Sequence, residues 1–292
     1  MRRVLLLAVI ATGLLFSPAI TCAEPAPPSV RIVADAAYKS GDSLSDYEKE
    51  RCKLDLYLPA SGSGFATIVW FHGGGLTGGN KGDTATAKLP RFFAGKGIAV
   101  ASVNYRLSPK TPFPGYVEDA AAAFAWVRAH IAEHGGDPEK VFISGHSAGA
   151  YLTAMLGMDV RYLRKLGLEP SSIAGLIPVS AQMTTHFTVR AERGIEKNTI
   201  ISDEAAPTYF TRKDTPPMLV LYADKDMPAR CEENAYFVAA MKAAGNEKIT
   251  GLMIAGRDHG SIAGKIVEPG DPAGTAMLEF IETIAKERGS KP

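Results

Sequence analysis

The chain alternates between short apolar runs and longer amphipathic stretches. The apolar runs are rich in Val and Ile and only a few residues long, which is typical of strands buried on both faces of a parallel sheet. We expect such strands at residues 65–71, 97–105, 140–145, 173–181, 218–224 and 249–256.

Helical periodicity fills the intervals between these runs. Over residues 116–135 the apolar side chains recur at spacings of three and four, at Val117, Ala120, Phe124, Val127 and Ile131. Similar patterns predict helices at 230–245, at 274–289 and directly after the run at 140–145. A repeated order of strand, loop and helix predicts an α/β fold, with a mostly parallel central sheet and helices on both of its faces.

Two segments depart from this pattern. At the N-terminal end, after an apolar run at 30–38, residues 51–59 alternate strictly between apolar and polar side chains, which predicts a half-buried antiparallel strand near a sheet edge. Residues 182–217 are instead polar, rich in Thr and interrupted by Pro207, Pro216 and Pro217. A loop of that length in a compact domain is typical of a lid or a binding insertion.

The first 23 residues have the pattern of a secretory signal peptide. Arg2 and Arg3 precede the apolar run 4–16, and small residues precede a cleavage position after Ala23. The run is shorter than the roughly 20 residues that a membrane-spanning helix needs, which disfavours the alternative of an uncleaved anchor. We expect an exported protein, periplasmic or secreted, with no stable membrane insertion once the signal is removed.

Composition adds few further constraints. At 292 residues and 46% hydrophobic, the chain can bury one large core, so we expect an N-terminal arm with the first strand (24–50) and one main domain (51–292). Loss of Arg2 and Arg3 with the signal would change the net charge from +1 to −1, which gives no reason to expect a nucleic-acid partner. Cys52 and Cys231 could form a disulfide or remain thiols, and the sequence leaves both open, together with the oligomeric state.

The most informative segment is "VFISGHSAGAYLTAML". It places Gly145-His146-Ser147-Ala148-Gly149 between a strand pattern and a helix pattern, which is the required context of a Gly-x-Ser-x-Gly nucleophile elbow. The turn holds Ser147 in a strained backbone conformation, and side chains at the two glycine positions would collide with neighbouring chain. The Ser147 hydroxyl is therefore predicted to project above the carboxyl end of the sheet as a nucleophile.

A serine hydroxyl needs a base, and in this arrangement an acid and then a histidine follow the serine along the chain. His259 is the only histidine after His186, so it is the candidate base. Asp226 lies in the loop after the strand at 218–224 and is the favoured acid. Asp224 at the strand end remains the alternative, with a role in bonding backbone groups of that loop.

At this point the sequence resembles a known superfamily. The segments "HGGG", "VNYRLSPKTPFPGYVEDAAAAFAWV", "GGDPEKVFISGHSAGA", "PPMLVLYADKD" and "DHGS" together are similar to α/β-hydrolases. Within that superfamily they resemble hormone-sensitive-lipase-like esterases and bacterial feruloyl and acetyl-xylan esterase-type proteins. His146 and Ala150 stand where lipase-like members usually have Asp and Gly, which favours the second group.

The resemblance implies a Ser147, Asp226 and His259 triad, acyl-enzyme chemistry and no cofactor. The backbone N–H groups of Gly74, Gly75 and Ala148 would then form an oxyanion hole, which explains the consecutive glycines in "FHGGG". For His72 we expect a structural role that fixes this loop.

Three further residues are candidates for contact with substrate, namely Leu76, His146 and His186. We expect a serine carboxylesterase acting on small or sugar-linked esters as small-molecule substrates. An arylformamidase-like amidase with the same triad is the alternative, and a non-catalytic binding protein is a weaker one. The sequence has no cluster of Cys and His residues at the spacing of metal ligands, so we do not expect a metal site.

Overall fold

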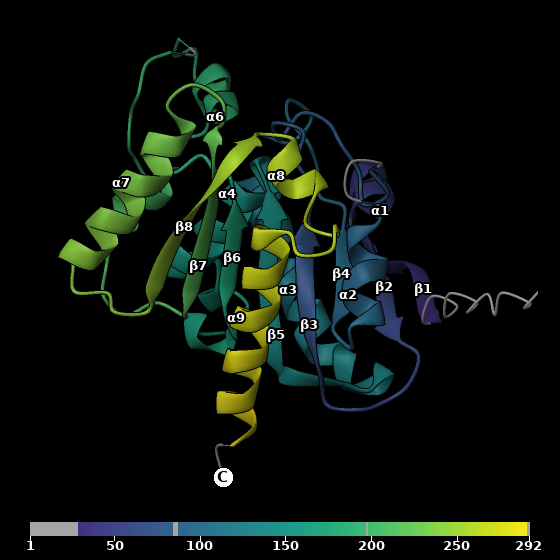
Figure 1. The fold of residues 1–292 in the computed structure, drawn as a ribbon. Coiled ribbons are helices and arrows are strands. Elements are labelled where there is room, and N and C mark those ends of the chain that lie inside the picture. Colours follow the sequence, from purple (N-terminus) through teal and green to yellow (C-terminus); the bar gives the residue numbers. More distant parts are fainter. Residues whose placement is uncertain (1–28, 84–86, 197, 291–292) are drawn as a thin grey trace, which may run out of the picture.

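A computed structural model of the protein describes residues 29–83, 87–196 and 198–290 (Figure 1). The predicted signal peptide lies outside the described residues. The strands are β1 (Val30–Ala37), β2 (Lys53–Pro59), β3 (Phe65–Phe71), β4 (Ala99–Val103), β5 (Gly136–His146), β6 (Leu176–Val179), β7 (Met218–Lys225) and β8 (Ile249–Asp258). The helices include α1 (Asp46–Arg51), α2 (Leu89–Gly95), α3 (Gly115–His130), α4 (Ala148–Met158), α5 (Val160–Arg164), α6 (Phe187–Glu192), α7 (Arg230–Ala243), α8 (Ser261–Gly264) and α9 (Pro272–Gly289).

The strands form one sheet with the order β1-β2-β4-β3-β5-β6-β7-β8. β2 pairs antiparallel with both β1 and β4. All the other neighbouring strands, from β4 along the sheet to β8, pair in parallel. The predicted mostly parallel α/β fold is thus confirmed, and so is the antiparallel strand near one edge. Because parallel strands share one direction, β5, β7 and β8 all end at the same edge of the sheet.

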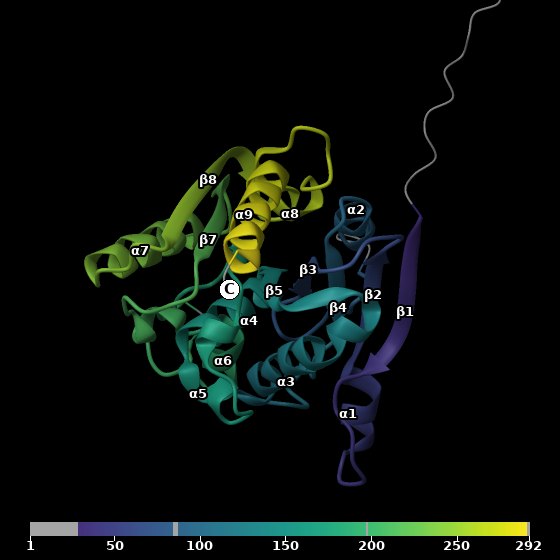
Figure 2. The same ribbon diagram turned by 90° about the horizontal axis from the view of Figure 1, so that it is seen from below.

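Helices cover both faces of the sheet and make two separate cores. Along β3, Val69 and Phe71 belong to one buried cluster with α3 and α4, while Ile68 and Trp70 belong to a second cluster with α2 and α9. Figure 2 shows α2, α8 and α9 on one side of the sheet and α3 and α4 on the other. Strands buried on both faces therefore read as continuous apolar runs in the sequence.

The polar segment 182–217 folds into a packed insertion at the carboxyl end of the sheet. It contains α6 and a short 3-10 helix, Pro207–Phe210. Several of its polar side chains bond within the segment, as where Thr185 Oγ1 donates to Asp203 Oδ1 at 2.7 Å. Tyr151 of α4 donates its hydroxyl to Ala205 O at 2.8 Å, which joins the insertion to the main domain.

Both cysteines of the described chain are free thiols. Cys52 is buried between α1 and β2, whereas Cys231 is partly exposed on α7, at the other side of the molecule (Figure 1). Within the described residues, no helix has the length and apolar character needed to cross a membrane.

Candidate active site

Ser147 occupies a sharp turn between β5 and α4. Its φ of 56° and ψ of −114° lie in a region that side chains rarely adopt. The turn passes so close to β3 that a Cβ added at Gly149 would lie 2.0 Å from Phe71 O, and one at Gly145 would lie 2.6 Å from the same atom. These two positions therefore require glycine, as expected for a nucleophile elbow.

The turn also places Ser147 at the N-terminus of α4. The first hydrogen bond of the helix runs from Tyr151 N to Ser147 O at 2.9 Å, so the N–H of Ala148 precedes the helical ladder. Such an N–H group and the helix dipole both favour negative charge beside the Ser147 hydroxyl.

The structure brings Ser147, His259 and Asp226 into one hydrogen-bonded chain. His259 Nε2 lies 2.8 Å from Ser147 Oγ, and His259 Nδ1 lies 2.6 Å from Asp226 Oδ1. His259 follows β8 and Asp226 follows β7, so three separate loops at one edge of the sheet supply the three groups. A carboxylate accepts only, so Nδ1 carries the hydrogen and Nε2 is free to accept a proton from Ser147.

Asp226 is held in its ionised form. Burial of its side chain opposes ionisation, but the hydrogen bond from His259 and the nearby Ser180 hydroxyl lower the pKa of Asp226 below its ordinary value. Met227 N also donates to Asp226 Oδ1 at 2.7 Å. The ionised carboxylate therefore stabilises a positive charge on His259.

Asp224 lies apart from this chain. Its carboxylate accepts from the backbone N–H of Arg257 at 3.0 Å. Backbone hydrogen bonds from Gly256 and Arg257 lower the pKa of Asp224. Asp224 thus links the ends of β7 and β8, and it leaves the contact with His259 to Asp226.

The glycine loop after β3 runs beside the nucleophile. A Cβ added at Gly73 would lie 3.5 Å from Ser147 Cβ, and Gly74 has a φ of 106°. The carbonyl of Gly73 accepts from His72 Nδ1 at 2.7 Å, and that of Gly74 accepts from Thr77 N and Gly78 N. Because the C=O and the following N–H of a trans peptide point in opposite directions, the N–H groups of Gly74 and Gly75 face away from these partners.

The glycine loop after β3 is also held by His72, Tyr105 and Arg51, on the side away from Ser147. His72 stacks on Tyr105 with ring centroids 4.3 Å apart, and the Tyr105 hydroxyl donates to His72 O at 2.8 Å. Arg51 Nη2 donates to Gly79 O at 3.1 Å. Burial lowers the pKa of His72 to about 4, so it is neutral and fixes the loop, which is the structural role expected for it.

The insertion closes over the other side of this loop. Thr188 donates its hydroxyl to Gly75 O. A Cβ added at Gly75, which has a φ of 63°, would lie 3.1 Å from Phe187 Cζ. The first turn of α6 therefore fixes the peptide between Gly75 and Leu76, which directly follows the second expected oxyanion donor.

The three expected substrate contacts have different surroundings. The Leu76 side chain is fully buried in the core, and its carbonyl accepts from Ser108 N. His186 is also buried, and its Nδ1 accepts from Thr188 N at 3.2 Å as the N-cap of α6. His146 packs against His259, with ring centroids 4.7 Å apart. In this structure Leu76 and His186 support the loops around Ser147 and present almost no surface to a ligand.

Two residues behind the triad were not expected from the sequence. Ser180, with a φ of 55°, directly follows β6, and its hydroxyl is buried beside Asp226. Neither Ser180 Oγ nor Asp226 Oδ2 has a hydrogen bond of ordinary geometry. Arg230 is buried and donates from Nη1 to Ser180 O at 3.0 Å. The sequence contains one signal for this support, which is an arginine at position 230, four residues after Asp226 and at the start of α7.

A groove of about 480 Å³ borders the loop that carries Asp226. It lies between the insertion and α7, with Ile200 and Thr208 on one side and Glu232 and Tyr236 on the other. The Tyr236 side chain is 64% exposed and Ile200 is 66% exposed. An aromatic face, hydroxyls and carboxylates thus lie together in a groove that reaches the loop after Asp226 at Ala229.

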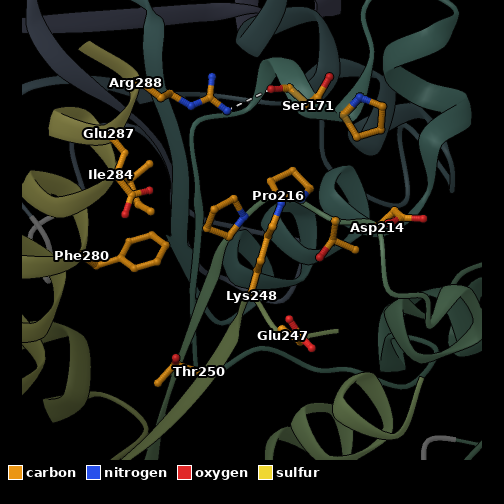
Figure 3. Close-up of a pocket in the computed structure, with 13 residues that line it drawn as sticks. Ser171, Asp214, Pro216, Glu247, Lys248, Thr250, Phe280, Ile284, Glu287 and Arg288 are labelled. Carbon is orange, nitrogen blue, oxygen red and sulfur yellow. Dashed lines mark hydrogen bonds between the residues drawn. The ribbon is translucent and has the colours of Figure 1, made fainter. Parts of the chain in front are cut away.

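A second cavity, of about 630 Å³, lies at the opposite edge of the sheet (Figure 3). It is lined by the segments that precede β7 and β8 and by α9, with Phe280 and Ile284 facing Pro216 and Lys248. Arg288 in its wall donates to Ser171 O at 3.0 Å. Because Ser147 lies beyond the carboxyl ends of the strands, this cavity is not part of the candidate active site. Among the described residues, no group of three or more His, Cys, Asp or Glu could hold a metal ion.

Family profiles agree with this geometry. The profile of the prolyl oligopeptidase family matches residues 117–280, which is more than half of the chain, and the BD-FAE profile matches residues 54–171. The first range includes all three residues of the hydrogen-bonded chain around Ser147.

Similar proteins carry esterase names. The chain is 26% identical to the esterase LipC of Mycobacterium tuberculosis over 66% of its own length and 52% of LipC. The chain thus spans about half the length of such curated relatives.

Solved structures share the fold. A thermophilic esterase from the Planctomycetes species Thermogutta terrifontis superposes with a TM-score of 0.65 at 26% identity, covering 90% of this chain and 93% of that one. A truncated carbohydrate esterase from gut microbiota superposes with a TM-score of 0.73 at 22% identity, covering 89% and 98%. The first of these has also been solved with propionate bound and phosphorylated by paraoxon.

Proposed function

Because this chain belongs to the prolyl oligopeptidase family, within the α/β-hydrolase superfamily, we propose that it is a serine carboxylesterase that hydrolyses small or sugar-linked esters. The observation that carries the proposal is the chain of contacts from Ser147 Oγ through His259 to Asp226, at 2.8 and 2.6 Å. These are the groups and distances that nucleophilic attack on a carbonyl requires.

The reaction proceeds through an acyl-enzyme. Ser147 Oγ attacks the carbonyl carbon and His259 Nε2 takes the hydroxyl proton. His259 then gives this proton to the departing alcohol oxygen, and the acyl group remains on Ser147. A water molecule, deprotonated by His259, attacks the acyl carbon, and the proton returns to Ser147 as the acid is released. Asp226 stays ionised and stabilises the imidazolium in both halves of the reaction.

The negative oxygen formed in each half is bound by backbone N–H groups of Gly74, Gly75 and Ala148. The carbonyls of Gly73, Gly74 and Gly75 are bonded elsewhere, which fixes the peptide planes of the loop. Donors fixed before the reaction need no reorganisation, and one such donor contributes about 3 to 4 kcal/mol to the transition state.

Two features support the substrate class. Phe187 and Thr188 pack directly on Gly75, which limits the space beside the oxyanion loop and favours short acyl groups. The Thermogutta terrifontis esterase has been solved with propionate and with butyrate, which are short acids. The groove with Tyr236 and Glu232, which reaches the loop after Asp226, offers an aromatic face and a carboxylate, groups that suit a sugar ring and its hydroxyls.

Export is part of the same proposal and rests on the sequence pattern of residues 1–23. Expression of the full chain in a bacterium, followed by periplasmic fractionation and N-terminal sequencing, is expected to give a mature protein that begins at Glu24. A cytosolic protein that retains Met1 would contradict export and leave the esterase proposal intact.

A fluorophosphonate probe tests the esterase proposal most directly, because it reacts with activated serines. We expect stoichiometric labelling of the wild-type protein and none of Ser147→Ala. No labelling of folded wild type would contradict both enzyme alternatives and favour a non-catalytic binding protein.

A substrate panel then separates ester from amide chemistry. We expect turnover of p-nitrophenyl acetate and of acetylated or feruloylated sugars to exceed that of long-chain p-nitrophenyl esters. A preference for N-formylkynurenine would favour the amidase alternative, which uses the same triad.

A further inference from the structure

We propose that His146 is a positioning residue, which ties the loop of the catalytic base to the nucleophile elbow and thereby sets the distance between His259 and Ser147. This inference rests on the proposed function, because it assigns a purpose to a residue beside the proposed triad. It gives His146 a role beyond the contact with substrate that the sequence led us to expect.

The tie is a hydrogen bond between a side chain and the backbone. His146 Nε2 lies 2.6 Å from the carbonyl oxygen of His259, a residue 113 positions away in the sequence. A carbonyl oxygen only accepts, so Nε2 of His146 carries the hydrogen and donates it. The two imidazole rings also pack against each other, with centroids 4.7 Å apart and planes inclined by 44°.

Few other contacts join the two loops. In the part of the chain that the structure describes, only two hydrogen bonds join residues 258–261 to residues 145–149, namely His146 to His259 O and His259 to Ser147 Oγ. The turn is braced internally, since Ser261 N donates to Asp258 Oδ1 at 2.7 Å and Asp258 N donates to Ser261 Oγ at 2.9 Å. Of these two hydrogen bonds to the elbow, only the one from His146 holds the backbone of the turn, so its loss lets the backbone at His259 shift relative to Ser147.

The two attachments differ during the reaction. The hydrogen bond between His259 and Ser147 is lost when Ser147 becomes acylated, whereas the bond from His146 to His259 O involves no reacting atom. It can therefore hold His259 in place through the acyl-enzyme stage, when His259 must activate water.

His146 also contacts the oxyanion loop. A Cβ added at Gly73 would lie 3.3 Å from His146 O and 3.4 Å from His146 Nδ1. The imidazole thus lies between the base loop and the glycine loop, directly before the nucleophile. Its neighbours fix its position from both sides.

The side chain is neutral at the pH where esterases work. Burial, together with the His259 and Arg230 side chains, lowers the pKa of His146 to about 4, although the hydrogen bond to His259 O and the Asp226 carboxylate oppose the shift. A neutral donor orients His259 without placing a second positive charge beside the imidazolium that forms on it.

Two substitutions separate the hydrogen bond from the volume of the ring. His146→Gln keeps an N–H donor near the position of Nε2, whereas His146→Leu fills the space without a donor. With p-nitrophenyl acetate, we expect His146→Leu to lower kcat roughly 10- to 100-fold, as small misplacements of catalytic groups do. KM should change by less than about twofold, and His146→Gln should recover most of the lost kcat, because it restores the donor.

A spectroscopic measurement tests the position of His259 directly. The Nδ1 proton of His259, in its 2.6 Å contact with Asp226, should give a strongly downfield proton NMR signal in the wild type. We expect this signal to shift in His146→Leu and to return in His146→Gln. Ile281→Ala, on the buried face of α9, is the matched control: it should lower Tm and leave both kcat and the signal unchanged.

Several outcomes would overturn the inference. Wild-type kcat in His146→Leu, or equal losses of kcat in the Leu and Gln variants, would mean that the hydrogen bond positions nothing. If both variants fail to fold, nitrogen-15 NMR of the wild type decides, because the proposal requires the neutral tautomer of His146 with the hydrogen on Nε2. A wild type that is not labelled at Ser147 would remove the proposed function itself, an outcome distinct from an active wild type with an unaffected His146→Leu.

Discussion

At the scale of single residues, two carboxylates near the end of β7 have opposite tasks. Asp226 Oδ1 lies 2.6 Å from His259 Nδ1, whereas Asp224 accepts from the backbone of Arg257. The two side chains are only two positions apart, yet only one can orient the base. Their chemistry is therefore separable by isosteric substitution.

We expect Asp226→Asn to lower kcat/KM by about 10³- to 10⁴-fold, because an amide at this position stabilises the wrong tautomer of His259 and no imidazolium. Asp224→Asn removes charge without removing a contact to His259, so the loss should stay within about tenfold. Steady-state kinetics on p-nitrophenyl acetate checks both, and the reverse ranking would reassign the acid of the triad.

Part of this residue-scale picture could be predicted from the sequence. The order of Ser147, Asp226 and His259 along the chain follows from a local motif and from the position of each residue after a strand. The environments of Leu76, His146 and His186 could not be predicted, because each depends on contacts between distant segments. His146 meets a carbonyl 113 positions away, for which no local pattern exists.

At the scale of elements, the insertion and the oxyanion loop form one unit. The first turn of α6 holds Gly75 O through Thr188, and His186 caps the same turn. A loop of glycines is flexible by itself, so its geometry depends on such attachments.

Thr188→Val is expected to lower kcat about three- to tenfold, because the peptide that directly follows Gly75 loses its partner and the oxyanion loop is held less firmly. The matched control is Thr185→Val, which removes the hydrogen bond to Asp203 inside the insertion and does not touch the oxyanion loop. Parallel measurements of kcat and Tm on both variants check the expectation. Equal kcat in the two variants would show that the insertion covers the loop without fixing it.

Strands were easier to predict than short helices. The buried strands appear as apolar runs because both of their faces are covered, and the observed β3 and β7 begin at the expected residues. The helices α1, α5, α6 and α8 have six residues or fewer, which is too short for a periodic pattern. For α1 a signal did exist, since Ser45 and Glu48 form a capping box, with Glu48 N donating to Ser45 Oγ at 3.2 Å.

At the scale of the whole molecule, the fold holds three histidines in neutral form, of which His72 and His186 are buried and His146 is partly exposed. Burial lowers the pKa of His72 and of His146 to about 4 and that of His186 well below its ordinary value. In the unfolded chain these side chains titrate near pH 6.5. Between about pH 6.5 and 4 the unfolded chain therefore binds more protons than the folded one, and the free energy of unfolding falls as the pH falls.

For His72 and for His146, the difference between the unfolded and folded pKa values corresponds to a loss of about 3 kcal/mol each in the free energy of unfolding once the pH is below both values. We expect urea denaturation at pH 7, 5.5 and 4.5 to show a steady decline in the free energy of unfolding. His72→Gln should be less stable at pH 7 and should show a shallower decline, because one of the three groups no longer titrates. A wild-type stability that is constant over this range would mean that these histidines are protonated in the folded state.

The two thiols differ in accessibility, so their rates of chemical modification report on local opening of the fold. Cys52 is buried where α1 meets β2, and burial raises its pKa to about 11, whereas Cys231 is partly exposed on α7. An alkylating reagent should therefore modify Cys231 in the native protein and reach Cys52 only when the antiparallel edge of the sheet opens. Mass spectrometry of the second modification over time then measures how often that edge detaches, in a molecule that is otherwise folded and active.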